Sequence, residues 1–154
     1  KRQVFNWFLV LKECSLMIID KEKLISQITP QLKTMGYKKR NNTWAKQSDP
    51  EMNIFIVINI QGSQYDKKDY YINLGVYIQA LGQKNIPTCI SDCQMQERIK
   101  VEINSSELLL KIIEKWENTY GLYNQIYDKV LENKMPKFTD KKLYSYFLVN
   151  GRKQ

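Results

Sequence analysis

Two stretches of alternating residues, 53–61 and 70–79, dominate the pattern of hydrophobic and polar positions along the chain. Their even positions are aliphatic, whereas their odd positions turn polar or aromatic. Successive side chains of a strand point to opposite faces, so the pattern predicts two half-buried antiparallel strands. Pairing Ile60 with Tyr70 places even residues opposite even ones. One face of this pair is then aliphatic, and the other carries Asn59, Gln61, Tyr71, Asn73 and Tyr77.

Helical periodicity precedes and follows these strands. Apolar residues spaced three and four apart predict a first helix, capped by Asp20 and ended by Gly36, which Pro30 is expected to bend or divide. Similar stripes predict three helices after the strands. The first of them ends at Gly121, the second runs to Met135-Pro136, and the third begins after Thr139 or Asp140.

Smaller elements complete the predicted fold. A short strand is expected around Trp44, a short helix from Ser91 through Arg98, and an extended stretch over 99–103. The order of helix, strands and helices indicates an α+β protein, with an antiparallel sheet of about four strands and helices packed on one face. We expect one domain over residues 17–154, because Met17 is a plausible start, and an N-terminal extension of uncertain origin over residues 1–16.

Short motifs in a fixed order link the chain to a known family. They are the segments 36–39, 42–44, 58–61, 72–77, 92–93 and 97–99. Through them, the region from Leu24 to Tyr127 resembles the bacterial family catalogued as domain of unknown function 4304. The resemblance implies a small cytoplasmic bacterial domain and brings no activity, substrate or cofactor. By analogy with other small α+β domains, it also suggests an immunity-type protein that binds a partner.

The net charge of the chain invites a nucleic-acid hypothesis, but the make-up of that charge argues against it. Lys and Arg number 24 against 16 Asp and Glu, which gives a net charge of +8. Only four of these cations are arginines, and the basic runs at 38–40, 67–68 and 141–142 lie far apart in the sequence. Two interpretations stay open. The lysines form a solvated surface, or lysine-rich loops and tyrosines bind nucleic acid or nucleotides.

Catalytic and metal-binding signatures are missing from the sequence. The chain has no histidine, so a Ser-His or Cys-His nucleophile is excluded, and we predict no metal site and no cofactor. Three cysteines, Cys14, Cys89 and Cys93, form no disulfide framework and indicate a reducing, cytoplasmic location. Cys93 is interpreted as a buried thiol, or as a nucleophile at a helix start. No apolar run reaches the roughly 20 residues that span a bilayer, so we expect no membrane association.

The polar face of the predicted sheet is the candidate binding surface. If helices cover the aliphatic face, Asn59, Gln61, Tyr71, Asn73 and Tyr77 stay open beside the small Gly75, which would let a ligand approach. Arg98 lies near Asp92 and Glu97 in the sequence. It forms a structural ion pair, or it presents its guanidinium to a carboxylate or phosphate at the edge of this face. We therefore predict a binding module that engages a protein partner, with nucleic-acid binding as the alternative and the question of an enzyme open.

Overall fold

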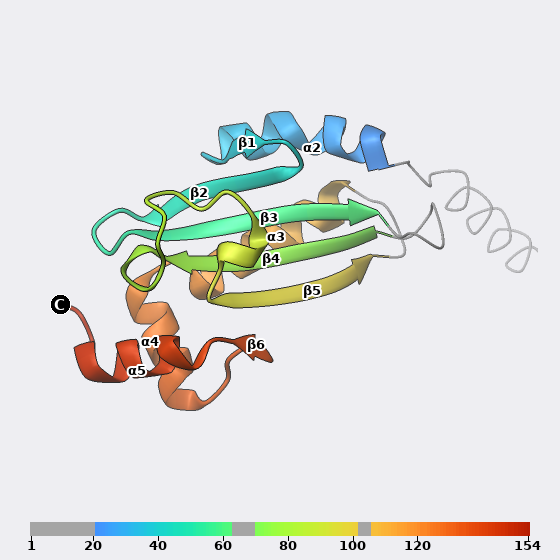
Figure 1. Ribbon diagram of the computed structural model, residues 1–154. Coiled ribbons are helices and arrows are strands. Elements are labelled where there is room, and N and C mark those ends of the chain that lie inside the picture. The colour runs from blue at the N-terminus through green and yellow to red at the C-terminus, as the bar shows by residue number, and fades with distance from the viewer. Residues whose placement is uncertain (1–20, 63–69, 102–105) are drawn as a thin grey trace, which may run out of the picture.

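One antiparallel sheet organises the protein, shown as a computed structural model in Figure 1. The structure describes residues 21–62, 70–101 and 106–154. Within them the sheet has six strands in sequential order: β1 (Lys38–Arg40), β2 (Thr43–Asp49), β3 (Ile54–Gly62), β4 (Tyr70–Ile78), β5 (Met95–Val101) and β6 (Phe138–Thr139). The α+β class is confirmed, with six strands in place of about four. The segment 1–16 with Met17, the cap at Asp20 and the pair Lys67-Lys68 lie outside the described residues.

The two alternating stretches form the centre of the sheet as neighbouring strands β3 and β4. Ile60 pairs with Ile72 rather than with Tyr70, so the predicted register is wrong by two residues. A shift of two keeps each side chain on its face, and the predicted division into an aliphatic and a polar face therefore stands. The aliphatic residues at even positions are all buried: Ile54, Ile56, Ile58, Ile60, Ile72, Leu74, Val76 and Ile78.

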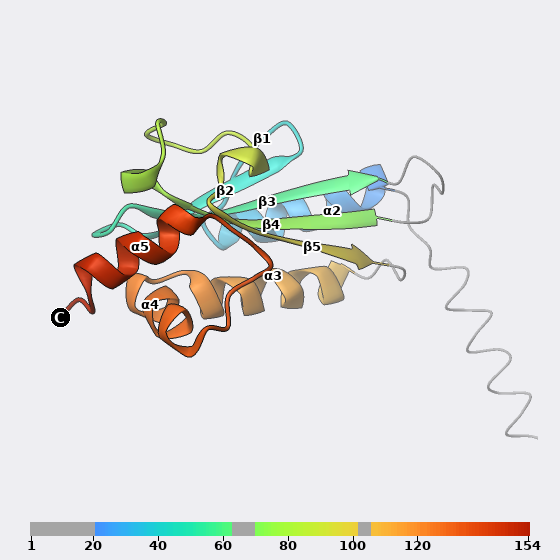
Figure 2. The same cartoon turned by 60° about the horizontal axis from the view of Figure 1, so that its bottom comes forward.

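Four described helices share one hydrophobic core with the aliphatic face. They are α2 (Lys21–Thr34), α3 (Ser106–Tyr120), α4 (Tyr123–Glu132) and α5 (Lys141–Asn150). Ile28 of α2, Ile113 of α3, Ile126 of α4 and Phe147 of α5 are fully buried in one cluster with the even residues of the sheet. Figure 2 shows α3 and α4 below the sheet in that view. Pro30 lies inside α2, which runs as one helix from Lys21 to Thr34, so the proline does not divide it. The apolar stripe of the helix is buried on both sides of the proline.

The C-terminal helices begin and end close to the predicted positions. α4 ends at Glu132, and the next residue, Asn133, caps it in the left-handed conformation with φ of 55°. Asp140 caps α5 by accepting a hydrogen bond from the Lys142 backbone N–H at 3.0 Å. The Asp49 carboxylate at the end of β2 accepts the N–H of Tyr123 at 2.9 Å, which fixes the start of α4 against the sheet.

The opposite face of the sheet is partly covered by the chain itself. Residues 79–94, with the short turns η1 (Gln79–Leu81) and η2 (Ile90–Asp92), lie across β3 and β4 on the side away from α3 (Figures 1 and 2). They bury Phe55, Val57 and Tyr77 together with Cys93. The predicted helix from Ser91 through Arg98 is wrong, because the turn ends at Asp92 and β5 begins at Met95.

Candidate functional site

The uncovered part of this face carries a row of polar side chains that crosses four strands. Thr43 of β2 is paired with Asn59 of β3, Asn59 with Asn73 of β4, and Asn73 with Arg98 of β5. Gln61 lies opposite Tyr71 in the neighbouring row. We call this set the polar ladder: Thr43, Asn59, Gln61, Tyr71, Asn73 and Arg98.

Hydrogen bonds between the amides fix the geometry of the polar ladder. Asn59 Nδ2 donates to the Asn42 carbonyl at 3.1 Å and to Thr43 Oγ1 at 3.3 Å. Asn73 Nδ2 donates to Asn59 Oδ1 at 3.1 Å and to Gln61 Oε1 at 3.4 Å. Because each amide is held by its neighbour, the surface is ordered before any partner arrives, which lowers the entropy that binding would cost.

Arg98 stands at the end of this network, with its guanidinium on the surface. Its Cζ lies 4.2 Å from the centroid of the Tyr71 ring, and Nη2 donates to Gln61 Oε1 at 3.0 Å. The side chain is nevertheless exposed. A guanidinium that is stacked and hydrogen-bonded on one edge can present another edge to a carboxylate.

The structural ion pair considered for Arg98 does not form with either acidic residue. Strand alternation turns Glu97 to the helix-covered face, where its partner in register is the core residue Leu74. Asp92 pairs with Lys84 at 2.9 Å. Sequence proximity suggested these partners, but the turn before β5 and the alternation along β5 direct them away from Arg98.

Tyr77 and Gly75 do not belong to the open surface, so their predicted role there is wrong. Tyr77 is only 1% exposed, and its hydroxyl donates to the Lys84 carbonyl at 2.5 Å and accepts the Lys84 N–H at 2.9 Å. A Cβ atom at Gly75 would lie 2.6 Å from Cys93 Sγ and 2.7 Å from Ile90 Cδ1. The space above this glycine is filled by the segment 79–94, which leaves no room for a ligand.

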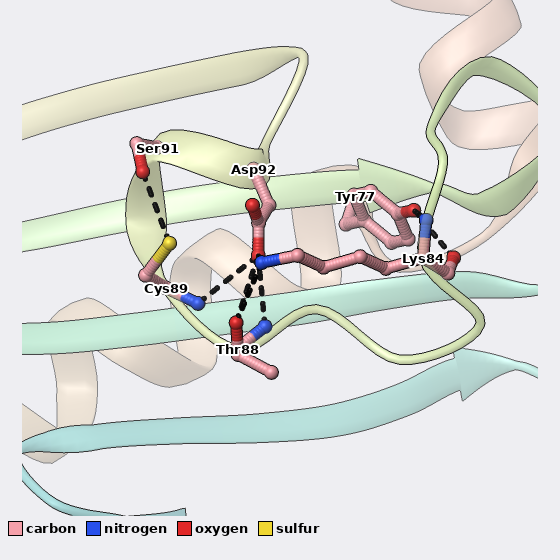
Figure 3. A network of polar contacts seen from close by, with 6 residues as sticks. All are labelled: Tyr77, Lys84, Thr88, Cys89, Ser91 and Asp92. Carbon is pink, nitrogen blue, oxygen red and sulfur yellow. Dashed lines mark hydrogen bonds and ion pairs between the residues drawn. The ribbon is translucent and has the colours of Figure 1, made fainter.

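A carboxylate at the end of η2 holds the covering segment in place (Figure 3). Asp92 Oδ2 accepts the backbone N–H groups of Thr88 at 2.9 Å and Cys89 at 3.2 Å, and the Lys84 ammonium at 2.9 Å. Burial alone would raise the pKa of Asp92, but the hydrogen bonds from Thr88, Lys84 and Cys89 outweigh it. They hold the pKa at about 2, against an ordinary value of 3.8. The same carboxylate therefore ties together the segment 79–94, which covers the part of this face next to the polar ladder.

The described residues bring together no evident catalytic or metal-binding group. Cys93 is 6% exposed, and burial raises the pKa of its thiol well above the ordinary value, so it has the properties of an inert core thiol. Within the described ranges, no three Cys, Asp or Glu side chains gather as metal ligands. Nor is any described helix both long and apolar enough to cross a bilayer.

Sequence reasoning missed two features of the site. Thr43 and the Asn42 carbonyl extend the polar ladder onto β2. The alternation of side chains along β2, read beside that of β3, could have placed Thr43 on the polar face. Phe55 and Val57 on the odd face indicated that part of this face is buried, because aromatic and aliphatic side chains there need a cover. The segment that supplies the cover could not be assigned from periodicity.

The fold and the site define a class of small α+β domain, in which helices cover one face of an antiparallel sheet and a preordered polar surface stays open on the other. A family model described as "Domain of unknown function (DUF4304)" matches residues 28–147. The chain belongs to this family. A search of curated proteins found no match, and a search of solved structures found none. The matched range contains the whole polar ladder and the segment that borders it.

Proposed function

We propose that this protein is a non-enzymatic binding module that engages a partner protein through the polar ladder. The observation that carries the proposal is the exposed guanidinium of Arg98, stacked on Tyr71 and hydrogen-bonded to Gln61. Arginine and tyrosine are enriched among the residues that dominate protein interfaces, since they combine contact area with directed hydrogen bonds.

The chemistry of the surface selects the kind of partner. Arg98 offers donors suited to a carboxylate, and the amides of Asn59 and Asn73 offer donors and acceptors suited to backbone groups or polar side chains. The net charge of +8 speeds association with an acidic protein. An immunity-type inhibitor, which covers the acidic surface of a toxin, is one form that such a module takes.

Capture of the partner from lysate of the organism that encodes the chain tests this proposal. Immobilised wild-type protein is compared with Arg98→Ala, Asn73→Ala and Lys141→Ala, with and without nuclease and at low and high salt. Lys141 is an exposed cation at the start of α5, so its variant is matched to Arg98→Ala for the loss of charge. We expect one protein that wild type and Lys141→Ala retain and that both ladder variants lose.

Each other result contradicts the proposal in a distinct way. If all four proteins retain the partner, the interface lies outside the polar ladder. If the retained material disappears with nuclease and at high salt, the basic surface binds nucleic acid instead, because phosphate contacts weaken steeply as salt rises. Capture of nothing under any condition removes the support for a protein partner.

A further inference from the structure

Of the described strands, only the short β6 pairs with the outer edge of β5. β6 pairs with β5 only at Met95 and Gln96. The same register would place Pro136 opposite Arg98, and proline has no N–H to donate to a sheet, so β6 cannot continue. Among the described residues, no strand pairs with the outer edge of β5 beyond Gln96 (Figure 1).

The direction of the backbone groups of β5 follows from the alternation along the strand. The Gln94 carbonyl accepts the N–H of Asp140 at 2.7 Å on the β6 side. Backbone groups two residues apart in a strand point to the same side, so those of Gln96 and Arg98 point to this side as well. Arg98 therefore presents an outward backbone N–H and C=O at the edge and a guanidinium at the end of the polar ladder.

The charges on this strand disfavour pairing with a second copy of itself. Arg98 and Lys100 lie on the same face of β5, as their partners Asn73 and Tyr71 do on β4. Two copies of β5 could pair antiparallel with the same faces aligned. The residues directly opposite one another would then be Arg98 and Arg98, Arg98 and Lys100, or Lys100 and Lys100. Like charges directly opposite one another destabilise a strand pair. The edge is thus guarded against self-association. On the face that carries Arg98 its charge would attract an acidic residue, whereas the exposed Glu97 lies on the other face of β5.

A cavity of about 270 Å³ lies on the helix side of the same edge, between β5 and α3. Its lining is mixed: Leu74 and Ile99 from the sheet and Ile112, Trp116 and Tyr120 from α3 are apolar or aromatic, and Glu97, Lys115 and Thr119 add polar groups. The rings of Trp116 and Tyr120 lie 4.6 Å apart and form its aromatic wall. Side chains on the helix-facing side of a strand added at the β5 edge would enter this cavity.

We propose that the β5 edge binds an extended acidic segment of the partner protein as an additional strand. Residues directly opposite in an antiparallel pair share a face, so an acidic residue opposite Arg98 meets the guanidinium beside the polar ladder. The neighbours of that acidic residue point to the other face and place apolar side chains in the cavity. Backbone hydrogen bonds supply affinity and the alternating side chains supply specificity, as in other strand additions. This inference rests on the proposed function, because it describes how the partner reaches the polar ladder.

Synthetic peptides added to the isotope-labelled full chain test the strand addition by NMR titration. The probe alternates glutamate with valine between serine-glycine ends. One control has lysine in place of glutamate, and another carries backbone N-methyl groups along the edge that would pair. We expect the glutamate peptide to bind at least about fivefold tighter than the lysine peptide. Replacing the glutamate opposite Arg98 with lysine turns an attractive cross-strand pair into a repulsive one. Hydrogen exchange at the Arg98 amide should slow, and the N-methylated peptide should not bind.

A variant separates the charge of Arg98 from its backbone. Arg98→Val keeps the outward N–H and removes the guanidinium, so it should still bind the glutamate peptide but no longer prefer it over the lysine peptide. Lys141→Val, the matched control, should keep the preference. Equal affinity for the two peptides in wild type, equal affinity for the N-methylated peptide, or no saturation by about 1 mM glutamate peptide overturns the inference.

The outcomes of this test differ from those of the proposed function. If partner capture depends on Arg98 and Asn73 but the glutamate peptide does not slow exchange at the Arg98 amide, the polar ladder binds its partner without strand addition. If the peptide pairs with the edge but Asn73→Ala has no effect on capture, the strand addition stands and the polar ladder is not the interface.

Discussion

The Asp92 carboxylate allows a quantitative prediction, because the segment that covers part of the sheet depends on it. We consider Asp92→Asn, which keeps the size of the side chain and removes its charge. A fall in pKa from 3.8 to about 2 corresponds to about 2.4 kcal/mol, at about 1.36 kcal/mol per pKa unit. The Lys84 side chain is 46% exposed, so solvent screening reduces the expected loss of stability at pH 7 to about 1–2 kcal/mol.

The sign of the pH dependence follows from the lowered pKa. Asp92 binds its proton more weakly in the folded protein than in the unfolded chain, so its contribution is fully present above pH 3.8 and is lost as the pH falls through about 2. Urea unfolding of wild type and Asp92→Asn should therefore show a difference in free energy at pH 7 that closes toward pH 2. Asp128→Asn, which removes an exposed partner of Arg152, is the matched control and should change little. A difference between wild type and Asp92→Asn that stays constant with pH would refute the reasoning.

Other substitutions and one chemical reaction test further parts of the structure. Gly75→Ala should cost about 1–3 kcal/mol in urea unfolding, because the new methyl group would lie 2.6 Å from Cys93 Sγ; an unchanged midpoint would show that the covering segment shifts freely. Ile113→Ala should cost about 2–5 kcal/mol, since the side chain is fully buried under the sheet, and a cost below about 1 kcal/mol would contradict that packing. Arg98→Ala should cost less than about 1 kcal/mol, as expected for exposed stacking, and a larger loss would give Arg98 a structural role. Alkylation of the native protein, followed by mass spectrometry, should modify Cys89 roughly tenfold or more faster than the buried Cys93.

The sequence predicted the faces of the sheet better than it predicted the pairing. A period of two assigns each residue of β3 and β4 to a face, whatever the register. A shift of two residues leaves that assignment unchanged, so the pattern could not distinguish Ile60 opposite Tyr70 from the observed Ile60 opposite Ile72. The observed register matters for the site, because it places Asn59 opposite Asn73.

Elements whose structure depends on distant contacts were predicted less well. The start of β5 was predicted as a helix, because Ser91 and Gln94 match a capping box, but Gln94 instead bonds through its side chain to the backbone of Ile78. Tyr77 was predicted to lie on the open surface because its side chain carries a polar hydroxyl. In the structure, that hydroxyl is hydrogen-bonded to the backbone of Lys84 in the covering segment. Local pattern could not reveal that residues 79–94 return across β3 and β4.

Site-specific photo-crosslinking in a lysate tests the central claim, that the polar ladder contacts a partner protein, most directly. A photoreactive amino acid replaces Gln61, an exposed member of the polar ladder, or Lys141 on α5 as the matched position. The account predicts a single protein adduct from position 61, resistant to nuclease, and none of that adduct from position 141. The same protein crosslinked only from position 141, equally from both positions, or from neither would contradict it.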